Sequence, residues 1–160
     1  MSPFRSTRKV KRTRRGTFEL SFDDDERTLL ATLPGQLREL LAAPDDPILR
    51  RLNPPAYVGD PDREREYRDL MGDDLLQSRL EALEVLESTA TADEVDEEQL
   101  VGWLRAVNDL RLVLGTRLDV SEDDDPMLLP PDDPSLPLWA LYQYLGLLQE
   151  QVIEALSDAL

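Results

Sequence analysis

Apolar residues, most of them leucine, recur at steps of three or four along most of the 160-residue chain. Side chains at this spacing fall on one face of an α-helix, and that face needs a partner to pack against. The pattern predicts a mainly α-helical fold of about six helical pieces around a leucine-rich core, with little sequence left for a sheet. The clearest run comprises Leu100, Val101, Trp103, Leu104, Val107, Leu110, Leu114 and Leu118.

Proline, glycine and short polar residues predict where these helices begin and end. Pro34 lacks a backbone N–H, so it predicts a break or a kink with a new helical piece beginning there. Asp60 followed by proline is typical of a helix start, and Gly72 predicts the end of that helix, with another beginning directly afterwards. Asp96 and Gln99 have the spacing of a capping box, in which two side chains bond to the backbone of the first turn.

A short β-element is predicted before the first helix. Phe18, Leu20 and Phe22 alternate with polar residues, and this period of two is typical of a half-buried strand. Residues 10–14 can pair with it as a hairpin that turns at Gly16. A two-stranded ribbon is marginal alone, so we expect it to pack on the helical body.

Charge is distributed very unevenly along the chain. The net charge is −16, from 34 acidic and 18 basic side chains, yet the first 15 residues hold seven basic side chains and no acid. We predict a basic arm (residues 1–15) followed by a single helical domain (residues 16–160), which contains an acidic, proline-rich loop at 119–137. The cations of the arm are Arg5, Arg8, Lys9, Lys11, Arg12, Arg14 and Arg15.

The basic arm has two interpretations. Its cations suit the phosphates of duplex DNA, and such contacts make binding strongly dependent on salt because they release counterions. The alternative is a solvated tail, or a segment that pairs with the acidic body of the same chain. The arm is the predicted route for any DNA contact, because the acidic helices would be repelled by a groove lined with phosphates.

The chain contains neither histidine nor cysteine. This excludes a Ser-His-Asp triad, a thiolate nucleophile, a disulfide and a cysteine-type zinc site. The sequence also lacks a phosphate-binding loop and a dinucleotide fingerprint. We therefore expect no enzymatic activity, no cofactor and no metal. Since there is no apolar run of about 20 residues and no secretion signal, we expect a cytoplasmic protein without a membrane partner.

Polar residues interrupt the apolar run between residues 103 and 120: Asn108, Asp109, Arg111 and Arg117. Buried polar groups must find partners, because leaving one unpaired costs on the order of 1–3 kcal/mol. The sequence favours a structural polar network that ties helices together. A small anion or ligand pocket is the alternative.

The last predicted helix runs from about residue 138 to 159. Its leucines have the three- and four-residue steps of a coiled coil, and aromatic and aliphatic neighbours widen the apolar face. Such a wide face is typical of burial within one subunit. The alternative is a homodimer that shares this C-terminal helix.

Four segments together resemble a known family. RLNPPAY, EYRDL, WLRAVNDLRLVLGTRLDV and LYQYLGLLQEQVIEAL are similar to the AosR-like family of actinobacterial oxidative-stress transcriptional regulators, formerly a domain of unknown function. The resemblance implies a cytoplasmic regulator that acts with a sigma factor or RNA polymerase and reaches promoter DNA. It marks as characteristic Arg51, Pro54, Pro55, Tyr57, Asn108, Asp109, Arg111, Gly115, Thr116 and Arg117.

Redox sensing in the described regulators is attributed to a cysteine pair. This chain has no cysteine, so the resemblance carries no disulfide switch. The leading prediction is a transcription-associated regulator that binds a protein partner through its acidic body and DNA through its arm. The alternative is a protein-interaction adaptor that makes no DNA contact.

Overall fold

The computed structural model describes residues 8–43, 46–52, 57–121 and 124–158. The described chain is mainly helical, as predicted, and it contains four α-helices where about six helical pieces were expected. These are α1 (Asp24–Leu41), α2 (Pro61–Thr89), α3 (Glu97–Leu118) and α4 (Leu136–Ser157). Short elements complete it: β1 (Val10–Arg12), β2 (Phe18–Leu20), β3 (Glu94–Val95) and the 3₁₀ turns η1 (Pro47–Leu49) and η2 (Pro126–Leu128).

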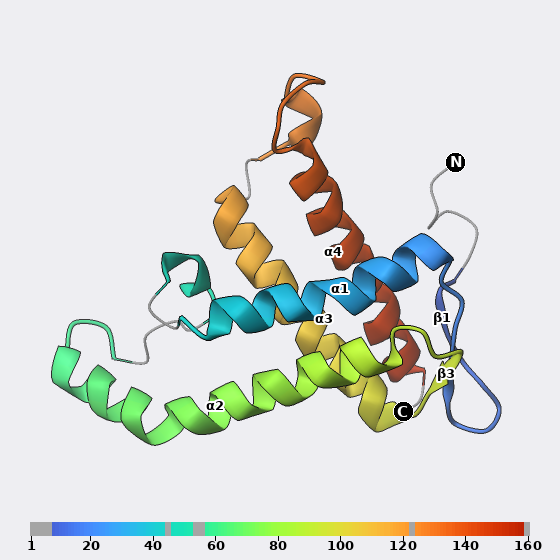
Figure 1. The fold of residues 1–160 in the computed structure, drawn as a ribbon, viewed down its shortest axis with the longest axis horizontal. Coiled ribbons are helices and arrows are strands. Elements are labelled where there is room, and N and C mark those ends of the chain that lie inside the picture. The colour runs from blue at the N-terminus through green and yellow to red at the C-terminus, as the bar shows by residue number, and fades with distance from the viewer. Residues whose placement is uncertain (1–7, 44–45, 53–56, 122–123, 159–160) are drawn as a thin grey trace.

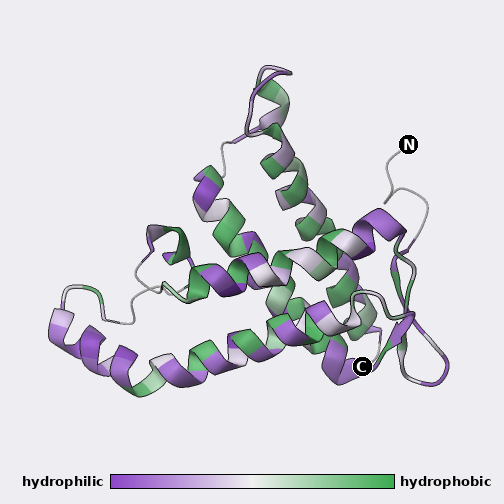
Figure 2. Cartoon of the chain, viewed as in Figure 1, coloured by the Kyte–Doolittle hydropathy of each residue, from purple (hydrophilic) through white to green (hydrophobic). Residues whose placement is uncertain are grey.

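Helices α3 and α4 form the centre of the molecule. They pack against each other along their length, α2 packs on α3, and α1 runs alongside α2 (Figure 1). The small sheet sits at the end of the bundle where α4 finishes, and α2 extends beyond the bundle at the opposite end (Figure 1). Figure 2 shows that the outer part of α2 is predominantly hydrophilic, whereas apolar residues gather where the helices meet.

Trp103 lies at the middle of the core and is fully buried. Its ring stacks on Phe22 with centroids 5.7 Å apart, which joins α3 to the segment after β2. The indole Nε1–H donates to Thr89 Oγ1 over 2.7 Å, so the one polar atom of the buried ring has a partner. This residue belongs to the clearest of the apolar runs in the sequence.

The predicted hairpin is present and is extended by a third strand. Val10 pairs with Leu20 across the antiparallel β1 and β2, and Gly16 in the turn has a φ of +83°. Strand β3, which pairs Val95 with Phe18, was not predicted because two residues carry no periodic signal. Val10 and Phe18 are fully buried, so the sheet packs on the helices as expected.

The capping signals are confirmed at atomic detail. Asp96 accepts a hydrogen bond from the Gln99 backbone N–H, and Gln99 Oε1 accepts one from the Asp96 N–H, over 2.7 and 2.9 Å. The same reciprocal pair joins Asp23 and Glu26 at the start of α1. These caps satisfy donors that the first helical turn leaves unpaired.

The predicted break at Pro34 is wrong, because α1 is one continuous helix through this residue. Proline inside a helix costs about 3 kcal/mol through its missing N–H and its clash with the preceding turn. Four leucines of α1 around Pro34 are buried, and Pro34 is itself buried. Their packing on one continuous face offsets the local cost.

The predicted end of a helix at Gly72 is also wrong, because α2 continues for 29 residues from Pro61 to Thr89. Glycine inside a helix costs only about 1 kcal/mol relative to alanine, and the neighbouring residues favour helix. Asp60 caps the start through the Arg63 N–H, as its position before proline predicted. Within the described residues, no helix is long and apolar enough to cross a bilayer.

Candidate functional site

The basic segment at the start of the chain lies against the acidic body. Arg8 Nη2 donates to Asp158 Oδ2 over 2.8 Å and is 3.5 Å from Glu154 Oε1. Arg12 Nη1 donates to the Asp158 carbonyl oxygen over 3.1 Å. Within the described residues, the segment predicted as an arm therefore contacts the end of α4 through Arg8 and Arg12.

Lys9 is the most deeply held of these cations. Its Nζ is 2.9 Å from Glu26 Oε1, with both side chains about 10% exposed, and its backbone N–H donates to Gln151 Oε1. The Tyr144 hydroxyl donates to the other carboxylate oxygen of Glu26, and burial, followed by this bond, raises the pKa of Tyr144. Removing one partner of a buried ion pair costs about 3–5 kcal/mol, so Lys9 is a structural residue here.

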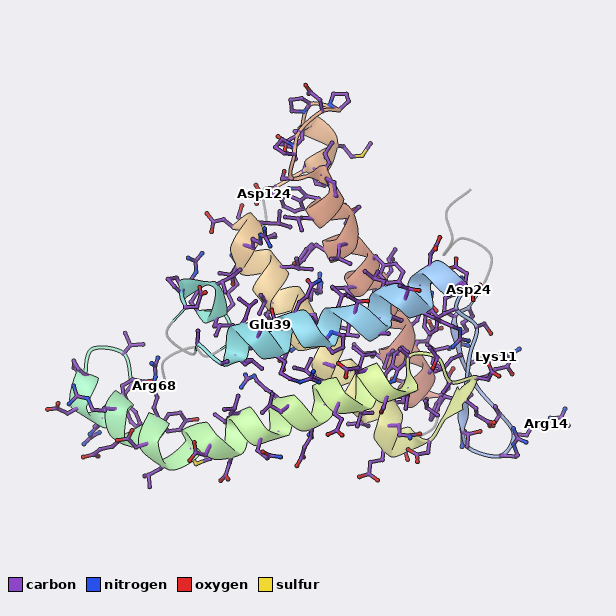
Figure 3. The ribbon with its side chains drawn as sticks, in the orientation of Figure 1. Lys11, Arg14, Asp24, Glu39, Arg68 and Asp124 are labelled. Carbon is purple, nitrogen blue, oxygen red and sulfur yellow. The ribbon has the colours of Figure 1, made fainter. Side chains whose placement is uncertain are left out.

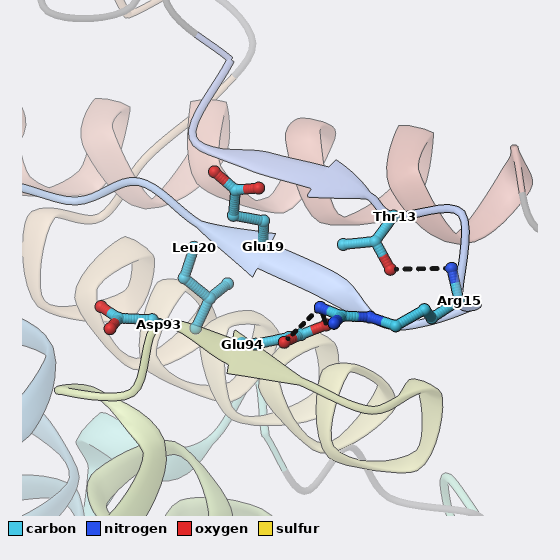
Figure 4. A pocket seen from close by; sticks show the side chains of 6 residues that line it. All are labelled: Thr13, Arg15, Glu19, Leu20, Asp93 and Glu94. Atoms are coloured by element: carbon cyan, nitrogen blue, oxygen red, sulfur yellow. Dashed lines mark hydrogen bonds and ion pairs between the residues drawn. The ribbon is translucent and has the colours of Figure 1, made fainter.

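Arg15 closes the hairpin onto β3. Its Nη2 contacts both carboxylate oxygens of Glu94 at 2.8 and 2.9 Å, as Figure 4 shows. Hydrogen bonds from Thr17 and then Arg15 hold the pKa of Glu94 below its ordinary value. A cavity of about 300 Å³ opens beside this pair, and Asp93 and Glu19 on its wall make it acidic.

Lys11 and Arg14 are the two described cations of the segment that are exposed and have neither an ion pair nor a side-chain hydrogen bond in the described structure. Arg14 lies at the tip of the hairpin and Lys11 on β1, both pointing outward (Figure 3). Arg5 lies outside the described residues. The seven predicted DNA-contacting residues are thus not equivalent, because four of the described six are engaged by the chain's own acidic or carbonyl oxygens.

Three of the four polar residues of α3, Asn108, Asp109 and Arg111, form contacts between helices. Asp109 is buried, and its Oδ2 lies 3.5 Å from Nε of Arg79 on α2. Burial raises the pKa of Asp109 to about 6, and the positive charge of Arg79 opposes that shift. Arg79 also donates to the Leu52 carbonyl oxygen over 2.7 Å, so it joins α2, α3 and the segment after η1.

A second network joins α3 to α4. Arg111 Nη1 donates to Gln149 Oε1 over 3.4 Å, and Gln149 Nε2 donates to Asn108 Oδ1 over 3.2 Å. The Arg111 guanidinium lies 4.8 Å from the centre of the Tyr142 ring, a cation–π distance. A Cβ on Gly146 would come within 3.3 Å of Arg111 Nε, so glycine leaves room for this arginine.

The remaining characteristic positions lie apart from these networks. Arg51 Nη2 donates to the Val120 carbonyl oxygen over 2.8 Å, and a Cβ on Gly115 would lie 2.9 Å from Arg51 Nη1. Thr116 bonds to its own helix, through the Leu112 carbonyl oxygen. Arg117 and Tyr57 are exposed, and Pro54 and Pro55 lie outside the described residues.

The alternative of a ligand pocket corresponds to a cavity of about 190 Å³ between α2 and α3. Asn108 and Asp109 line it, whereas Arg111 and Arg117 do not. Arg79 and Arg105 supply the cations on its wall, and sequence reasoning missed both as site residues. In the described part of the chain, no group of three acidic residues is arranged to hold a metal ion.

Comparisons with known proteins place the chain in a family. The family model "Domain of unknown function (DUF2017)" matches residues 1–156. The chain belongs to the DUF2017 family. The resemblance drawn from the sequence is confirmed, because curated relatives carry the AosR name.

The curated relatives are mycobacterial. The putative oxidative stress regulator AosR of Mycobacterium leprae is 32% identical over 130 residues, covering 71% of this chain and 59% of that protein. The oxidative stress regulator AosR of Mycobacterium tuberculosis is 30% identical over 133 residues, covering 72% and 61%. This DUF2017 chain therefore spans about three fifths of the length of these relatives. No solved structure matches it.

Proposed function

We propose that this protein is a non-enzymatic regulator that acts on the transcription machinery, a sigma factor or RNA polymerase, chiefly through protein contacts. The names of its relatives support regulation linked to oxidative stress. One observation favours protein contacts over DNA contacts. Oxygen atoms of the same chain already bind the side chains of Arg8, Lys9, Arg12 and Arg15. The strongly acidic body is therefore the surface available to bind a partner.

Contact with DNA is a secondary part of this proposal, and it falls to Lys11 and Arg14. Both are exposed on the hairpin, where a phosphate can approach without breaking an ion pair. Each phosphate neutralised contributes about −0.9 to the slope of log K against log salt. Two contacts give a slope near −2, whereas seven would give a slope near −6.

Fluorescence anisotropy on duplex DNA across a salt series tests this part. We expect weak binding with the shallow slope, and loss of binding in Lys11→Ala/Arg14→Ala. The variant Arg65→Ala/Arg105→Ala removes two exposed cations elsewhere and is the matched control. Deleting residues 1–15 is unsuitable, because it removes β1 and the buried Lys9–Glu26 pair together with the cations.

An adaptor that makes no DNA contact is the second candidate. It is favoured by the same intramolecular pairing of the basic segment. Absence of DNA binding at low salt, together with binding to purified polymerase or a sigma factor, would establish this second candidate. A steep slope near −6 would contradict both versions, because it requires the paired cations to leave the fold.

A further inference from the structure

Helix α2 consists of a packed part and a projecting part. Its buried residues all lie in the C-terminal part, beginning at Ala82. Residues 61–78 extend beyond the bundle (Figure 1), and we call them the projecting half. Two ion pairs in or next to the segment support its helical form: Arg68 with Glu64 one turn earlier, over 3.2 Å, and Arg63 with the capping residue Asp60.

The projecting half carries apolar side chains that the described structure leaves partly exposed, and one of them, Leu75, borders the cavity between α2 and α3. The apolar side chains on one face, which we call the α2 stripe, are Met71, Leu75 and Leu76, with exposed fractions of 41, 40 and 37%. Leu70, which is 77% exposed, lies on the opposite side of the helix. None of the three stripe residues belongs to the core or to the residues packed against it. Met71 and Leu75 precede Arg79 at steps of four, so they continue the face that the packed part buries.

Acidic residues surround the stripe. The projecting half holds six acidic and three basic side chains. Two of the three arginines, Arg63 and Arg68, pair with acids in or next to the segment. Asp69, Asp73 and Asp74 have no ion pair in the described structure and lie beside the stripe leucines. An exposed apolar stripe with an acidic border is complementary to an apolar groove with a basic rim.

We propose that the projecting half is a docking helix, and that the α2 stripe enters an apolar groove bordered by lysines and arginines on a partner protein. The inference deepens the proposed function and rests on it, since it assigns the contact with the transcription machinery to this helix. A helix already formed binds at lower entropic cost than a segment that folds on contact.

The charges disfavour two other occupants. In an antiparallel pair of α2 helices centred on the stripe, Asp73 and Asp74 of the two copies would meet, and like charges in contact are repulsive. Nucleic acid is disfavoured because this helix is negatively charged. The partner's chemistry is therefore that of a basic protein surface.

The experiment measures binding of the full chain to purified RNA polymerase core and to each purified sigma factor of the source organism by biolayer interferometry. The test variant is Met71→Ala/Leu75→Ala, which retains helix propensity. The matched control is Met127→Ala/Leu128→Ala, the same residue types at exposed positions around η2. We expect affinity about 30-fold lower for the test variant and unchanged for the control.

A second comparison tests the basic rim. We expect affinity to fall as salt is raised, with a smaller fall in Asp73→Asn/Asp74→Asn than in the wild type. Glu84→Gln/Glu150→Gln removes two exposed charges elsewhere and should retain the wild-type salt dependence. Circular dichroism and thermal melting of each variant separate loss of binding from loss of fold.

The outcomes distinguish failure of the docking helix from failure of the proposed function. If the wild type binds none of the purified proteins, the proposed function fails and the docking helix with it. If it binds and the stripe variant binds equally well, the proposed function stands and the docking helix is overturned. Light scattering that gives twice the 18.2 kDa mass of the chain, with a monomer on stripe substitution, would overturn it in favour of a second copy.

Discussion

The two parts of α2 differ in what stabilises them, although they belong to one uninterrupted helix. The C-terminal part buries Leu83 and Leu86 fully against α1 and α3, so tertiary packing maintains it. The projecting half buries none of its side chains. It is helical because extending an existing helix avoids the cost of nucleation, and a capped start and local ion pairs add to this. A long helix can therefore present a surface that its own fold does not use.

Truncating matched leucines gives the largest expected difference between the two parts. We expect Leu86→Ala to lower the free energy of unfolding by about 2–5 kcal/mol, because it leaves a cavity in the core. Leu70→Ala should change it by less than about 0.5 kcal/mol, because that side chain is exposed. Urea denaturation measures both, and a cost above about 1.5 kcal/mol for Leu70→Ala would mean that this side chain is covered in solution.

Replacing glycine by alanine at one position in each region should change stability by smaller amounts, and in opposite directions. A Cβ on Gly102 in α3 would lie 3.0 Å from Val85 Cγ1 on the packed part of α2, so we expect Gly102→Ala to cost about 1–3 kcal/mol. A Cβ on Gly72 meets nothing within 4 Å. We expect Gly72→Ala to stabilise the helix by about 0.5–1 kcal/mol. Destabilisation by Gly72→Ala in thermal melts would contradict a continuous α2.

The smallest expected effect is the pH dependence of stability that Asp109 contributes. This residue of α3 contacts Arg79, where the two parts of α2 meet. Burial raises the folded pKa of Asp109 to about 6 from an ordinary value of 3.8. The folded state therefore binds a proton between pH 6 and 4 that the unfolded state does not, which adds stability as pH falls. We expect the wild type to gain on the order of 1 kcal/mol over Asp109→Asn between pH 7 and 4.5.

Chemical denaturation at several pH values measures this difference. Asp69→Asn, which removes one exposed charge from the projecting half, is the control for the loss of a carboxylate. A constant difference in stability between the wild type and Asp109→Asn across this range would show that Asp109 is not buried in solution.

Local signals in the sequence predicted the features that are set locally. The capping box at Asp96, the strand around Phe18 and the apolar face of α3 depend on neighbours in sequence, and all are present. The breaks at Pro34 and Gly72 were wrong because the penalty of each residue is modest beside what the surrounding helix gains. Strand β3 was missed because its pairing with β2 depends on tertiary position.

The candidate site also combines features that the sequence predicts with contacts that depend on tertiary position. The polar residues of α3 were identified from the sequence, yet their partners Arg79, Gln149 and Tyr142 come from other helices. Glu26 and Tyr144 are 118 residues apart and share one hydrogen bond, and no spacing rule connects them. The charge split between the basic segment and the acidic body was visible in the sequence. Which cations of the basic segment remain exposed in the fold depends on the position of the end of α4.

The hairpin also has a consequence for the order of assembly. Lys9 donates to Gln151, 142 positions later, and Arg8 donates to Asp158, 150 positions later. During synthesis the first strand emerges from the ribosome long before these partners exist. The guanidinium groups of Arg8 and Arg12 therefore lack these partners in the nascent chain until α4 has been made, and docking of the hairpin on α4 is a late event in folding.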